Sequence, residues 1–462
     1  MSLLIPGTNS IKDTGYNVSN SLRFDDASND WLSKTFSSSG NRQRQTISVW
    51  IKRCNLAASS SIFSVYYTGS TYANFYFNSS DQLQYFNNGG SYNLTTNRVF
   101  RDTSAWYHIL LKLDTKDSTA DDRIKMYVNG VQETSFAART NPGLNAEVTF
   151  GDNYAHYIGT YNNGASDNFD GYMSQFFFTT NVSYGPDSFG ETDSDTGLWV
   201  PIEVSGLAFN TNAFYLSFED SSALGTDDSS NSNNFSVNNL TSIDQVTDTP
   251  TNNFMTLNPL STDSGVTLSN GNTESDFDAS VGNAKGTIGL TSGRWYWEVK
   301  ATNAASNYPM IGIGSMNEAQ MTNPTGGSYP GGFANSYGTY GTGIVYANGS
   351  NTGSQSFTYG TGDIIGVYLD LESSTKTIKW YKNGSSMATY DITNSGNDYP
   401  FTCMDYNGGE GAVNVNYNFG NPAFSISSGN TDDNGYGNFE YSPNISTTKY
   451  YAVCTKNIAE FG

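Results

Sequence analysis

The chain has 462 residues and a formal net charge of −21, from 22 basic and 43 acidic residues. Such an acidic surface repels phosphate backbones and anionic lipid, which disfavours nucleic acid or a membrane surface as the partner. Charged residues make up only 14%, whereas Gly (47), Tyr (32) and Phe (27) are abundant, and this composition indicates an all-β protein because strands favour aromatic residues and turns favour glycine.

Residues 1–20 are predicted to form an N-terminal arm, because they contain Pro6, Gly7 and Gly15 and show little periodicity. The arm has no basic start and only a short apolar patch, so we expect neither a secretion signal nor a membrane span. The three cysteines are too few and too scattered for a disulfide framework or a zinc site. They are Cys54, Cys403 and Cys454.

Residues 21–205 are predicted to form a first β-sandwich. Short segments of alternating apolar and polar residues follow one another here, separated by clusters of Gly, Asn, Ser and Asp, which is typical of such a fold. The stretch 184–191, which contains Pro186 and Gly190, is expected to close the domain. The strand candidates are 21–24, 46–52, 61–65, 73–77, 82–86, 147–150, 156–160 and 171–178.

Residues 206–253 are predicted to form a crossover strand at 214–218 followed by an acidic linker. Residues 254–462 are expected to form a second sandwich with a C-terminal tail. Its strand candidates are 294–300, 310–314, 412–419 and 450–454, and the segment 326–349 is too rich in glycine for a regular strand throughout.

One hairpin pattern occurs in both predicted sandwiches. In each, an alternating strand ends in Leu-Asp, a polar turn follows, and a second alternating strand ends in Tyr-x-Asn-Gly, at 127–130 and again at 381–384. Alternation places Ile109, Leu111 and Leu113 on one face of the strand. Asn-Gly after an alternating run is a strong hairpin signal, because both residues accept positive φ. The repeat therefore predicts two tandem antiparallel β-sandwich domains.

Seven motifs in the first domain resemble, in order, the laminin G-like branch of the concanavalin A-like lectin/glucanase family. They are SLRF (21–24), TISVWIK (46–52), IFS (62–64), AWYHILLKLD (105–114), RIKMYVNG (123–130), YIG (157–159) and FDGYMSQFFF (169–178). The resemblance implies a jelly-roll sandwich of antiparallel sheets.

The second domain resembles a SPRY domain. The matching motifs are GRWYWEVK (293–300), IGIG (311–314), GDIIGVYLDL (362–371) and TIKWYKNG (377–384). This resemblance implies a second bent sandwich that binds partners through its loops. The order of the two domains, joined by DTPTNNFMTLNPL (248–260), is similar to that of structural proteins encoded by marine tailed phages.

The sequence does not predict an enzyme. Glucanases need two carboxylates that flank the glycosidic bond, and on this fold they occupy alternate positions of one strand. No Glu-x-Asp-x-x-Glu run occurs, and the adjacent pair Glu219 and Asp220 would point to opposite faces of a strand. The only histidines are His108 and His156, and His108 lies in a strand, where we expect a structural role.

Calcium is the candidate cofactor, because some laminin G-like domains bind it through Asp side chains and loop carbonyls. Asp152, Asp167 and Asp170 are the matching candidates around the 156–178 strand pair. Asp170, in Phe-Asp-Gly, can equally be a turn residue that bonds its own backbone.

Aromatic residues on loops are the candidate ligand-binding groups. Aromatic rings cover the apolar C–H faces of sugars, while Asn, Asp and Ser bind the hydroxyl groups. The alternative is that these rings pack on one another and stiffen their loops. The candidates are Tyr154 and Tyr161 in the first domain and Tyr329, Phe333, Tyr337 and Tyr340 in the second. Five tryptophans lie in predicted strands and are expected to be core or sheet-face residues, not binding platforms: Trp50, Trp106, Trp295, Trp297 and Trp380.

The sequence thus predicts a non-enzymatic phage virion surface protein: a fibre, an appendage or a capsid decoration. We expect synthesis in the host cytoplasm, a place on the virion surface, and a homo-oligomer. The expected partners are other virion proteins and host surface glycans or a receptor, with no nucleic acid and no membrane insertion. A purely architectural virion protein and a carbohydrate-active enzyme on a lectin-type fold are the alternatives.

Overall fold

The computed structural model describes residues 15–87, 91–278, 281–304, 309–316, 329–354, 357–393, 401–409 and 411–462. Within these ranges, residues up to 251 form one compact unit and residues from 252 onward form another. Regular structure is almost entirely strand, so the fold is all-β, as the sequence predicts. None of the helices in the described ranges has the length and apolar character that a membrane span requires.

The first unit is built on two large antiparallel sheets. One contains β1 (Ser21–Phe24), β3 (Arg44–Arg53), β8 (Trp106–Asp114), β9 (Ile124–Val128), β10 (Val131–Gln132), β13 (Gly171–Thr180), β16 (Phe214–Leu216) and β18 (Gln245–Val246). Its strand order is β10-β9-β8-β3-β13-β1-β18, and β16 also pairs with β13.

The other sheet of this unit contains β2 (Trp31–Thr35), β4 (Ser60–Thr68), β5 (Thr71–Phe77), β6 (Gln82–Asn87), β7 (Tyr92–Val99), β11 (Phe136–Thr140), β12 (Ala155–Ile158) and β17 (Ser236–Asn238). Its order is β11-β7-β6-β5-β4-β12-β2-β17. A separate small pair joins β14 (Gly190–Thr192) to β15 (Trp199–Pro201), and short 3-10 turns are η1 (Ala120–Asp122), η2 (Pro186–Ser188) and η3 (Ser242–Asp244).

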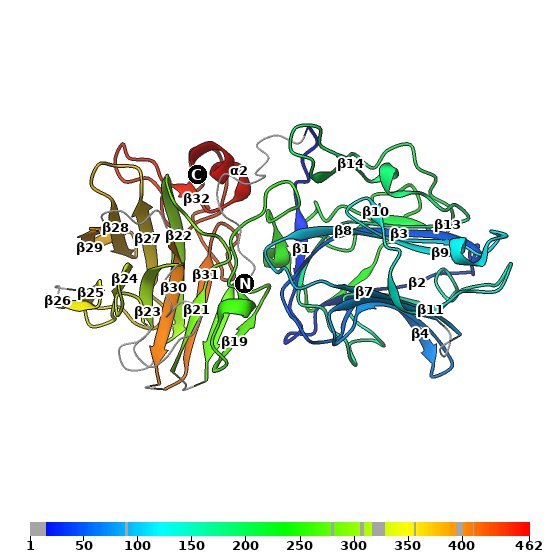
Figure 1. Cartoon of the computed structure of the whole chain (residues 1–462), viewed down its shortest axis with the longest axis horizontal. Helices are drawn as coiled ribbons and strands as arrows, with labels where there is room; N and C mark the ends of the chain where they lie inside the picture. The colour runs from blue at the N-terminus through cyan, green and yellow to red at the C-terminus, as the bar shows by residue number, and fades with distance from the viewer. Residues whose placement is uncertain are drawn as a thin grey trace. The chain divides into compact units, whose positions relative to one another are not determined.

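The two large sheets of the first unit stack as layers around a common core (Figure 1). Ile109 and Leu111 of β8 and Phe75 and Leu83 of β5 and β6 belong to one cluster and are completely buried. Alternation along each strand therefore places its apolar residues between the layers, as the sequence predicts for β8.

Both predicted hairpins are confirmed. β8 pairs with β9, and Asn129 and Gly130 have positive φ (47° and 77°) and turn the chain into β10. In the second unit β27 pairs with β28, and Asn383 and Gly384 (φ 48° and 78°) lead into β29. Asn-Gly suits these turns because both residues tolerate positive φ.

The predicted crossover and linker, 206–253, differs from the structure. Its residues up to 251 belong to the first unit and supply three strands to the two sheets: β16 pairs with β13, β17 with β2, and β18 with β1. Apolar residues such as Phe214, Leu224 and Phe235 enter the same core, which explains why this polar stretch folds onto the sandwich. Residues 1–14 of the predicted arm lie outside the described ranges, while the Tyr16 hydroxyl donates to Gln175 Oε1 at 3.4 Å.

The second unit also has two large sheets. The first contains β19 (Val266–Ser269), β20 (Glu274–Phe277), β22 (Arg294–Asn303), β27 (Ile364–Asp370), β28 (Thr377–Lys382), β29 (Ser385–Asp391), β31 (Val413–Asn418) and β32 (Tyr451–Ala452). The second contains β21 (Val281–Lys285), β23 (Met310–Ser315), β24 (Ser336–Thr339), β25 (Ile344–Ala347), β26 (Ser350–Ser354) and β30 (Phe401–Gly408). Their orders are β19-β20-β31-β22-β27-β28-β29, with β32 parallel to β22, and β21-β30-β23-β24-β25-β26. η4 (Pro259–Ser261) precedes β19, and the helix α2 (Thr455–Phe461), which the sequence analysis missed, follows β32.

Tryptophans occupy the centre of the second core. Trp295, Trp297 and Trp380 are completely buried and pack with aliphatic residues of both sheets. In the first unit, Trp50 and Trp106 are buried on β3 and β8 beside Tyr172. The prediction that all five tryptophans are core or sheet-face residues in strands is confirmed.

Candidate functional site

A candidate binding site on the first unit is a groove of about 290 Å³, which we call the tyrosine groove. Its floor comes from β5 and β6, and its wall comes from the turn that follows β12. The lining residues are Tyr72, Asn74, Tyr76, Gln84, Phe86, Tyr161 and Asp167.

Strand alternation creates the floor of this groove. Ala73, Phe75 and Phe77 point into the core and are completely buried, so Tyr72 and Tyr76 on the same strand face outward and are half-buried. The outer face of this sheet thus carries aromatic and amide side chains where a simple sandwich would carry small or charged ones.

Aromatic rings form a connected wall. Tyr72 stacks on Phe86 at a centroid distance of 5.5 Å, and Tyr161 meets Tyr72 edge to face at 6.0 Å. Tyr161 also contacts Tyr66 of β4 edge to face at 5.4 Å. Edge-to-face and offset pairs are the favoured geometries for aromatic rings, so the wall is held in place before any ligand arrives.

Polar groups of the floor form a hydrogen-bonded network. Tyr76 Oη donates to Gln84 Oε1 at 2.9 Å, and Gln84 Nε2 donates to Asn93 Oδ1 at 3.1 Å. Asn74 Nδ2 donates to Asp167 Oδ2 at a long 3.4 Å. Burial raises the pKa of the Tyr76 phenol to about 12, so this hydroxyl stays protonated and can donate.

The turn from Tyr161 to Asp167 positions the wall. Backbone bonds join Tyr161 and Ser166 in both directions, and Asn162, Asn163 and Asp167 have positive φ. Asparagine and aspartate tolerate this conformation better than bulky residues. Burial raises the pKa of the Asp167 carboxyl above its ordinary value.

The groove unites two residues that the sequence analysis had assigned to different roles: Tyr161 as a ligand-binding ring and Asp167 as a calcium ligand. Tyr154, the other aromatic candidate of this domain, does not line the groove. It is half-buried and stacks on the exposed Tyr67 at 4.2 Å.

The other two calcium candidates have different surroundings. Asp152 is buried, forms an ion pair with Arg42, and accepts a hydrogen bond from Ser39 Oγ at 2.5 Å. Asp170 is buried next to β13, and its backbone carbonyl accepts from the Cys54 N–H at 3.1 Å. Within the described ranges, no three His, Cys, Asp or Glu side chains come together in a way that could hold a metal ion.

Both histidines are buried structural groups. Nδ1 of His108 accepts from Trp199 Nε1 at 3.1 Å, so its Nε2 donates to Ser48 Oγ at 2.8 Å. Burial lowers the pKa of His108 to about 3 and that of His156 to about 4. Both rings are therefore neutral at physiological pH, and the structural role predicted for His108 is confirmed.

The aromatic candidates of the second domain are largely packed against the protein itself. Tyr337 lies in β24 and is completely buried, and Phe333 is buried against Met316 and Met404. Tyr329 is half-buried with its ring 5.3 Å from that of Tyr346, and Tyr340 is half-buried as well. The expectation of an exposed aromatic loop is therefore corrected for Phe333 and Tyr337, because Tyr337 is part of β24 and Phe333 packs against the two methionines.

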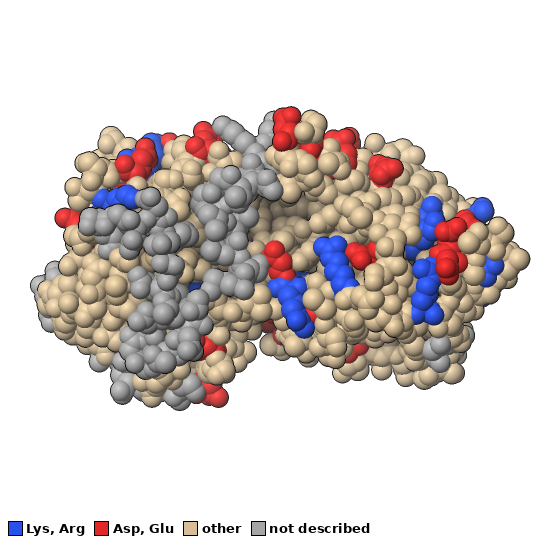
Figure 2. All heavy atoms as spheres, viewed as in Figure 1, with Lys and Arg blue, Asp and Glu red and all other residues tan. Residues whose placement is uncertain are grey.

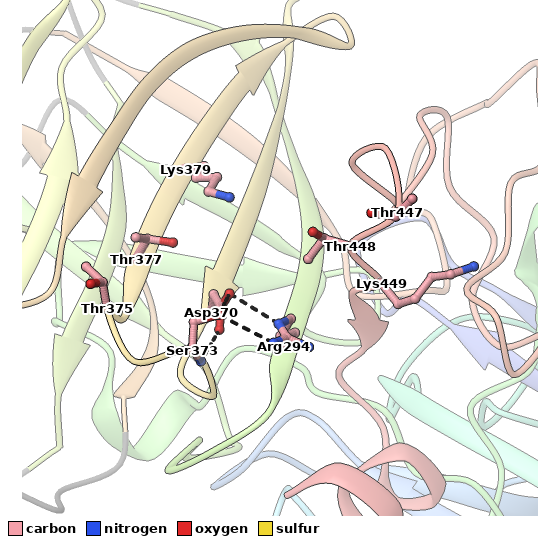
Figure 3. Close-up of a pocket in the computed structure, with 9 residues that line it drawn as sticks. All are labelled: Arg294, Asp370, Ser373, Thr375, Thr377, Lys379, Thr447, Thr448 and Lys449. Atoms are coloured by element: carbon pink, nitrogen blue, oxygen red, sulfur yellow. Dashed lines mark hydrogen bonds and ion pairs between the residues drawn. The ribbon is translucent and has the colours of Figure 1, made fainter.

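A second depression, of about 410 Å³, lies on the second unit (Figure 3). Asp370 accepts from Arg294 Nε at 3.2 Å and from Ser373 Oγ at 2.7 Å, and Lys379 Nζ donates to Tyr450 Oη at 3.1 Å. No aromatic ring is among its lining residues, so it lacks the face that the tyrosine groove offers a sugar. The lining residues are Arg294, Asp370, Ser373, Thr375, Thr377, Lys379, Thr447, Thr448 and Lys449.

Charged side chains on the face seen in Figure 2 are scattered in small mixed groups. Arg44 pairs with Asp114 and Arg98 with Glu133 on the first unit, at 3.1 and 3.0 Å. Most of the face drawn in Figure 2 is uncharged.

Sequence analysis missed the groove floor, although a signal was present. The segment 72–76 reads Tyr-Ala-Asn-Phe-Tyr, and its alternation separates a core face from a face that carries Tyr72, Asn74 and Tyr76. Half-buried tyrosines that repeat on the outer face of a strand are the pattern that could have identified the site.

Two family models match the chain in the same order as the two units. Residues 26–181 match the laminin G model of the Concanavalin A-like lectin/glucanases superfamily, and residues 294–418 match the SPRY domain. The chain contains a concanavalin A-like domain followed by a SPRY domain. No curated protein matches it.

Solved structures similar to parts of the chain include SPRY domains and one sugar-binding candidate. The SPRY domain of human HERC1 is 17% identical over 35% of this chain and 96% of its own, with a TM-score of 0.29. The TRIM65 PSpry domain is 15% identical over 36% of this chain and 91% of its own, with a TM-score of 0.28. A putative carbohydrate binding protein from Bacteroides ovatus is 16% identical over 48% of this chain and 59% of its own, with a TM-score of 0.32.

Proposed function

We propose that the chain is a non-enzymatic surface protein of a phage particle, and that its concanavalin A-like domain adheres to host glycans through the tyrosine groove. The fibre, appendage or decoration role rests on the order of the two domains, which resembles that of marine tailed-phage structural proteins. The adhesive role rests on the groove itself.

One observation carries the adhesive role: half-buried tyrosine rings and a hydrogen-bonding floor converge in one small groove. Its volume of about 290 Å³ lies at the lower end of the several hundred Å³ usual for ligand pockets, so it suits one or two sugar rings. The rings of Tyr72 and Tyr161 offer apolar faces and edges for sugar C–H groups, and Asn74, Gln84 and Asp167 offer partners for hydroxyl groups.

Hydrolysis is a poorer fit to the same groove. Glycosidases place two carboxyl groups on either side of the scissile bond. Asp167 is the only carboxylate among the lining residues of this groove, and neither histidine lines it. A site with one carboxylate can bind a hydroxyl group but lacks the second group that retaining and inverting mechanisms both require.

Many weak sites would act together on one particle. A shallow groove of this size gives weak single contacts, and multiple copies on one particle raise the overall avidity without any stronger site. A homo-oligomer on the virion surface, next to other virion proteins, would supply those copies. The SPRY domain would then present its loops to neighbouring virion subunits or to a host receptor.

A glycan array with the full chain, displayed in many copies on beads, tests the adhesive role. Wild-type protein is expected to bind a defined group of glycans, and free oligosaccharide is expected to compete. If the protein displayed in many copies bound no glycan on the array, this result would contradict adhesion and favour a purely architectural protein. Mass spectrometry of purified phage particles from the source tests the virion setting separately.

A further inference from the structure

Lys52 and Asp248 form a buried pair on the face of the first unit's β3 sheet that is turned away from the main core. Lys52 Nζ lies 2.8 Å from Asp248 Oδ2, and the two side chains are 0% and 1% exposed. Lys52 is on β3, and Asp248 follows β18, near the end of the unit. We propose that these two side chains join covalently, forming an amide between Lys52 Nζ and the Asp248 carboxyl carbon.

Surrounding groups hold the two reactants against each other. Trp106 Nε1 donates to Asp248 Oδ1 at 3.0 Å, and Ser21 Oγ donates to the Asp248 backbone carbonyl at 2.6 Å. The Lys52 ammonium lies 5.4 Å from the centre of the Tyr172 ring. Fixing two reacting groups at contact distance raises their effective concentration by many orders of magnitude, which lowers the entropic part of the barrier to amide formation.

Burial favours the amide over the ion pair. Withdrawing two ions from water costs hydration free energy, which their mutual attraction roughly offsets. The amide is neutral and keeps one carbonyl oxygen, which can accept the hydrogen bond from Trp106 Nε1. The reaction thus removes two buried charges, and the released water leaves the site.

This pair differs from the other ion pairs in the described ranges. Lys125 with Asp122, Lys382 with Asp363 and Lys449 with Asp433 all have both partners partly exposed, so water stabilises their charges. The comparably buried pair of Arg53 with Asp81 cannot react in this way, because a guanidinium does not lose its proton in proteins. Among the described ion pairs, Lys52 with Asp248 alone combines an amine, a carboxyl group and full burial.

Atoms and charges balance without an added reagent. The ammonium passes one proton to the carboxylate, which leaves a neutral amine and a carboxylic acid. The amine lone pair then forms the N–C bond, a second N–H proton moves to the hydroxyl oxygen, the C–O bond breaks, and one water molecule departs. The pair is neutral overall before and after the reaction, and nothing is oxidised or reduced.

A second carboxyl group lies near the reacting pair. Asp170 is opposite Cys54 on the neighbouring strand, diagonal to Lys52 on the same buried face. Asp170, Asp248 and Lys52 all act on the pKa of the Cys54 thiol, which places the three charges within electrostatic reach of one point. In the proposed reaction, Asp170 would carry a proton from the nitrogen to the departing oxygen.

The cross-link would join the start of the sandwich covalently to its end. It would connect β3 to the segment after β18 and close a ring over most of the first unit. The three cysteines of the chain are free and buried, so disulfides do not perform this task. An amide is stable in a reducing cytoplasm, where a disulfide is not.

Intact-mass spectrometry of the purified full chain tests the proposal. Wild type is expected to weigh one water molecule less than its sequence, and Lys52→Arg is expected to keep the full mass. Digestion of wild type should yield a branched species that joins the peptide of Lys52 to the peptide of Asp248. Full mass in wild type after prolonged incubation at 37 °C, or a water loss that persists in Lys52→Arg, would overturn the proposal.

The variant Asp170→Asn tests the proton relay with the ion pair intact. The fraction of cross-linked chain, followed by intact mass after synthesis, is expected to rise several-fold more slowly than in wild type. An unchanged rate would remove Asp170 from the scheme. Because wild type alone decides whether the link exists, a variant that fails to fold leaves the main test intact.

Discussion

The ring of Tyr161 stands edge-on against the ring of Tyr72, with centroids 6.0 Å apart and planes at 77°. Tyr161 comes from the turn after β12 and Tyr72 from β5, so this contact ties the groove wall to its floor. Tyr66 also contacts Tyr161 edge to face, which restricts the ring further. A ring fixed in this way loses little entropy when a ligand covers it, and that favours binding.

Glycan binding is expected to weaken on acidification. Burial raises the pKa of Asp167, so this carboxylate takes up a proton at a higher pH than an exposed aspartate does. Protonation removes a charged acceptor for sugar hydroxyl groups, and a charge-assisted hydrogen bond contributes roughly 1.5–3 kcal/mol. Affinity measured by calorimetry should therefore fall as the pH is lowered from 7 through this raised pKa, and complete protonation should cost about tenfold or more, since each factor of ten corresponds to about 1.4 kcal/mol.

Asp167→Asn is the control for this pH dependence. The amide keeps the size of the side chain and one acceptor oxygen but does not titrate. We expect weaker binding that is nearly constant over the same pH range. An Asp167→Asn variant with the wild-type pH profile would show that another group causes the change.

The second unit is expected to lose stability as the pH rises from about 4 to about 7. Asp405 on β30 is completely buried, accepts from the Ala284 N–H at 3.1 Å, and hydrogen bonds with Ser275 Oγ at 3.0 Å. Burial raises its pKa to about 7 from an ordinary value of 3.8. The folded state thus holds the proton more tightly than the unfolded state, so its contribution is complete below pH 4 and lost by about pH 7.

Denaturant unfolding at pH 5 and pH 8 measures this effect. The full loss, from below pH 4 to above pH 7, is on the order of 4 kcal/mol, because a difference of one pKa unit corresponds to about 1.4 kcal/mol, and roughly 3 kcal/mol of it falls between pH 5 and pH 8. Asp405→Asn carries no charge and fits both hydrogen bonds, so it should abolish most of the difference between the two pH values. An equal decrease in wild type and Asp405→Asn would contradict the assignment to this carboxyl group.

Tyr337 is expected to stabilise the second unit and not to bind an external ligand. Its ring is completely buried, and its hydroxyl accepts from Asn348 Nδ2 at 3.1 Å and from the Thr393 N–H at 3.2 Å. Tyr337→Ala should lower the free energy of unfolding by roughly 3–5 kcal/mol, as for other buried aromatic residues. Tyr340→Ala, at a half-buried position, should cost about 1 kcal/mol. Similar small losses in both variants would contradict the core assignment.

Periodicity and turn chemistry predict much of this fold. Alternation predicts the observed bounds of β1, and it predicts those of β3, β8, β13, β22 and β27 to within a few residues. Asn-Gly predicts both hairpin turns. The missed strands β2, β7 and β17 are largely polar, and β2 and β17 also depend on pairing with strands distant in the sequence. The linker prediction failed for the same reason, since Phe214 and Phe235 reveal their burial only once the sandwich exists.

The candidate site is only partly predictable from the sequence. Tyr161 and Asp167 stand out because they flank a turn rich in Asn and Gly, but nothing local reveals that they face β5. Tyr337 and Phe333 look like loop residues because glycines surround them, yet those glycines permit close sheet packing: a Cβ at Gly338 would lie 2.4 Å from the Pro330 carbonyl oxygen. A high density of glycines can thus indicate close backbone packing, as it does here, and not only a flexible loop.

The most direct test of the tyrosine groove compares three full-length proteins on the glycan that wild type binds best. Tyr161→Ala removes the wall, whereas Tyr67→Ala removes a 59% exposed tyrosine that does not line the groove. Surface plasmon resonance with immobilised glycan is expected to show at least a tenfold loss for Tyr161→Ala, as for the removal of a ring worth about 1.4 kcal/mol or more, and little change for Tyr67→Ala. Wild-type affinity in a folded Tyr161→Ala protein would contradict the proposal that this groove is the binding site.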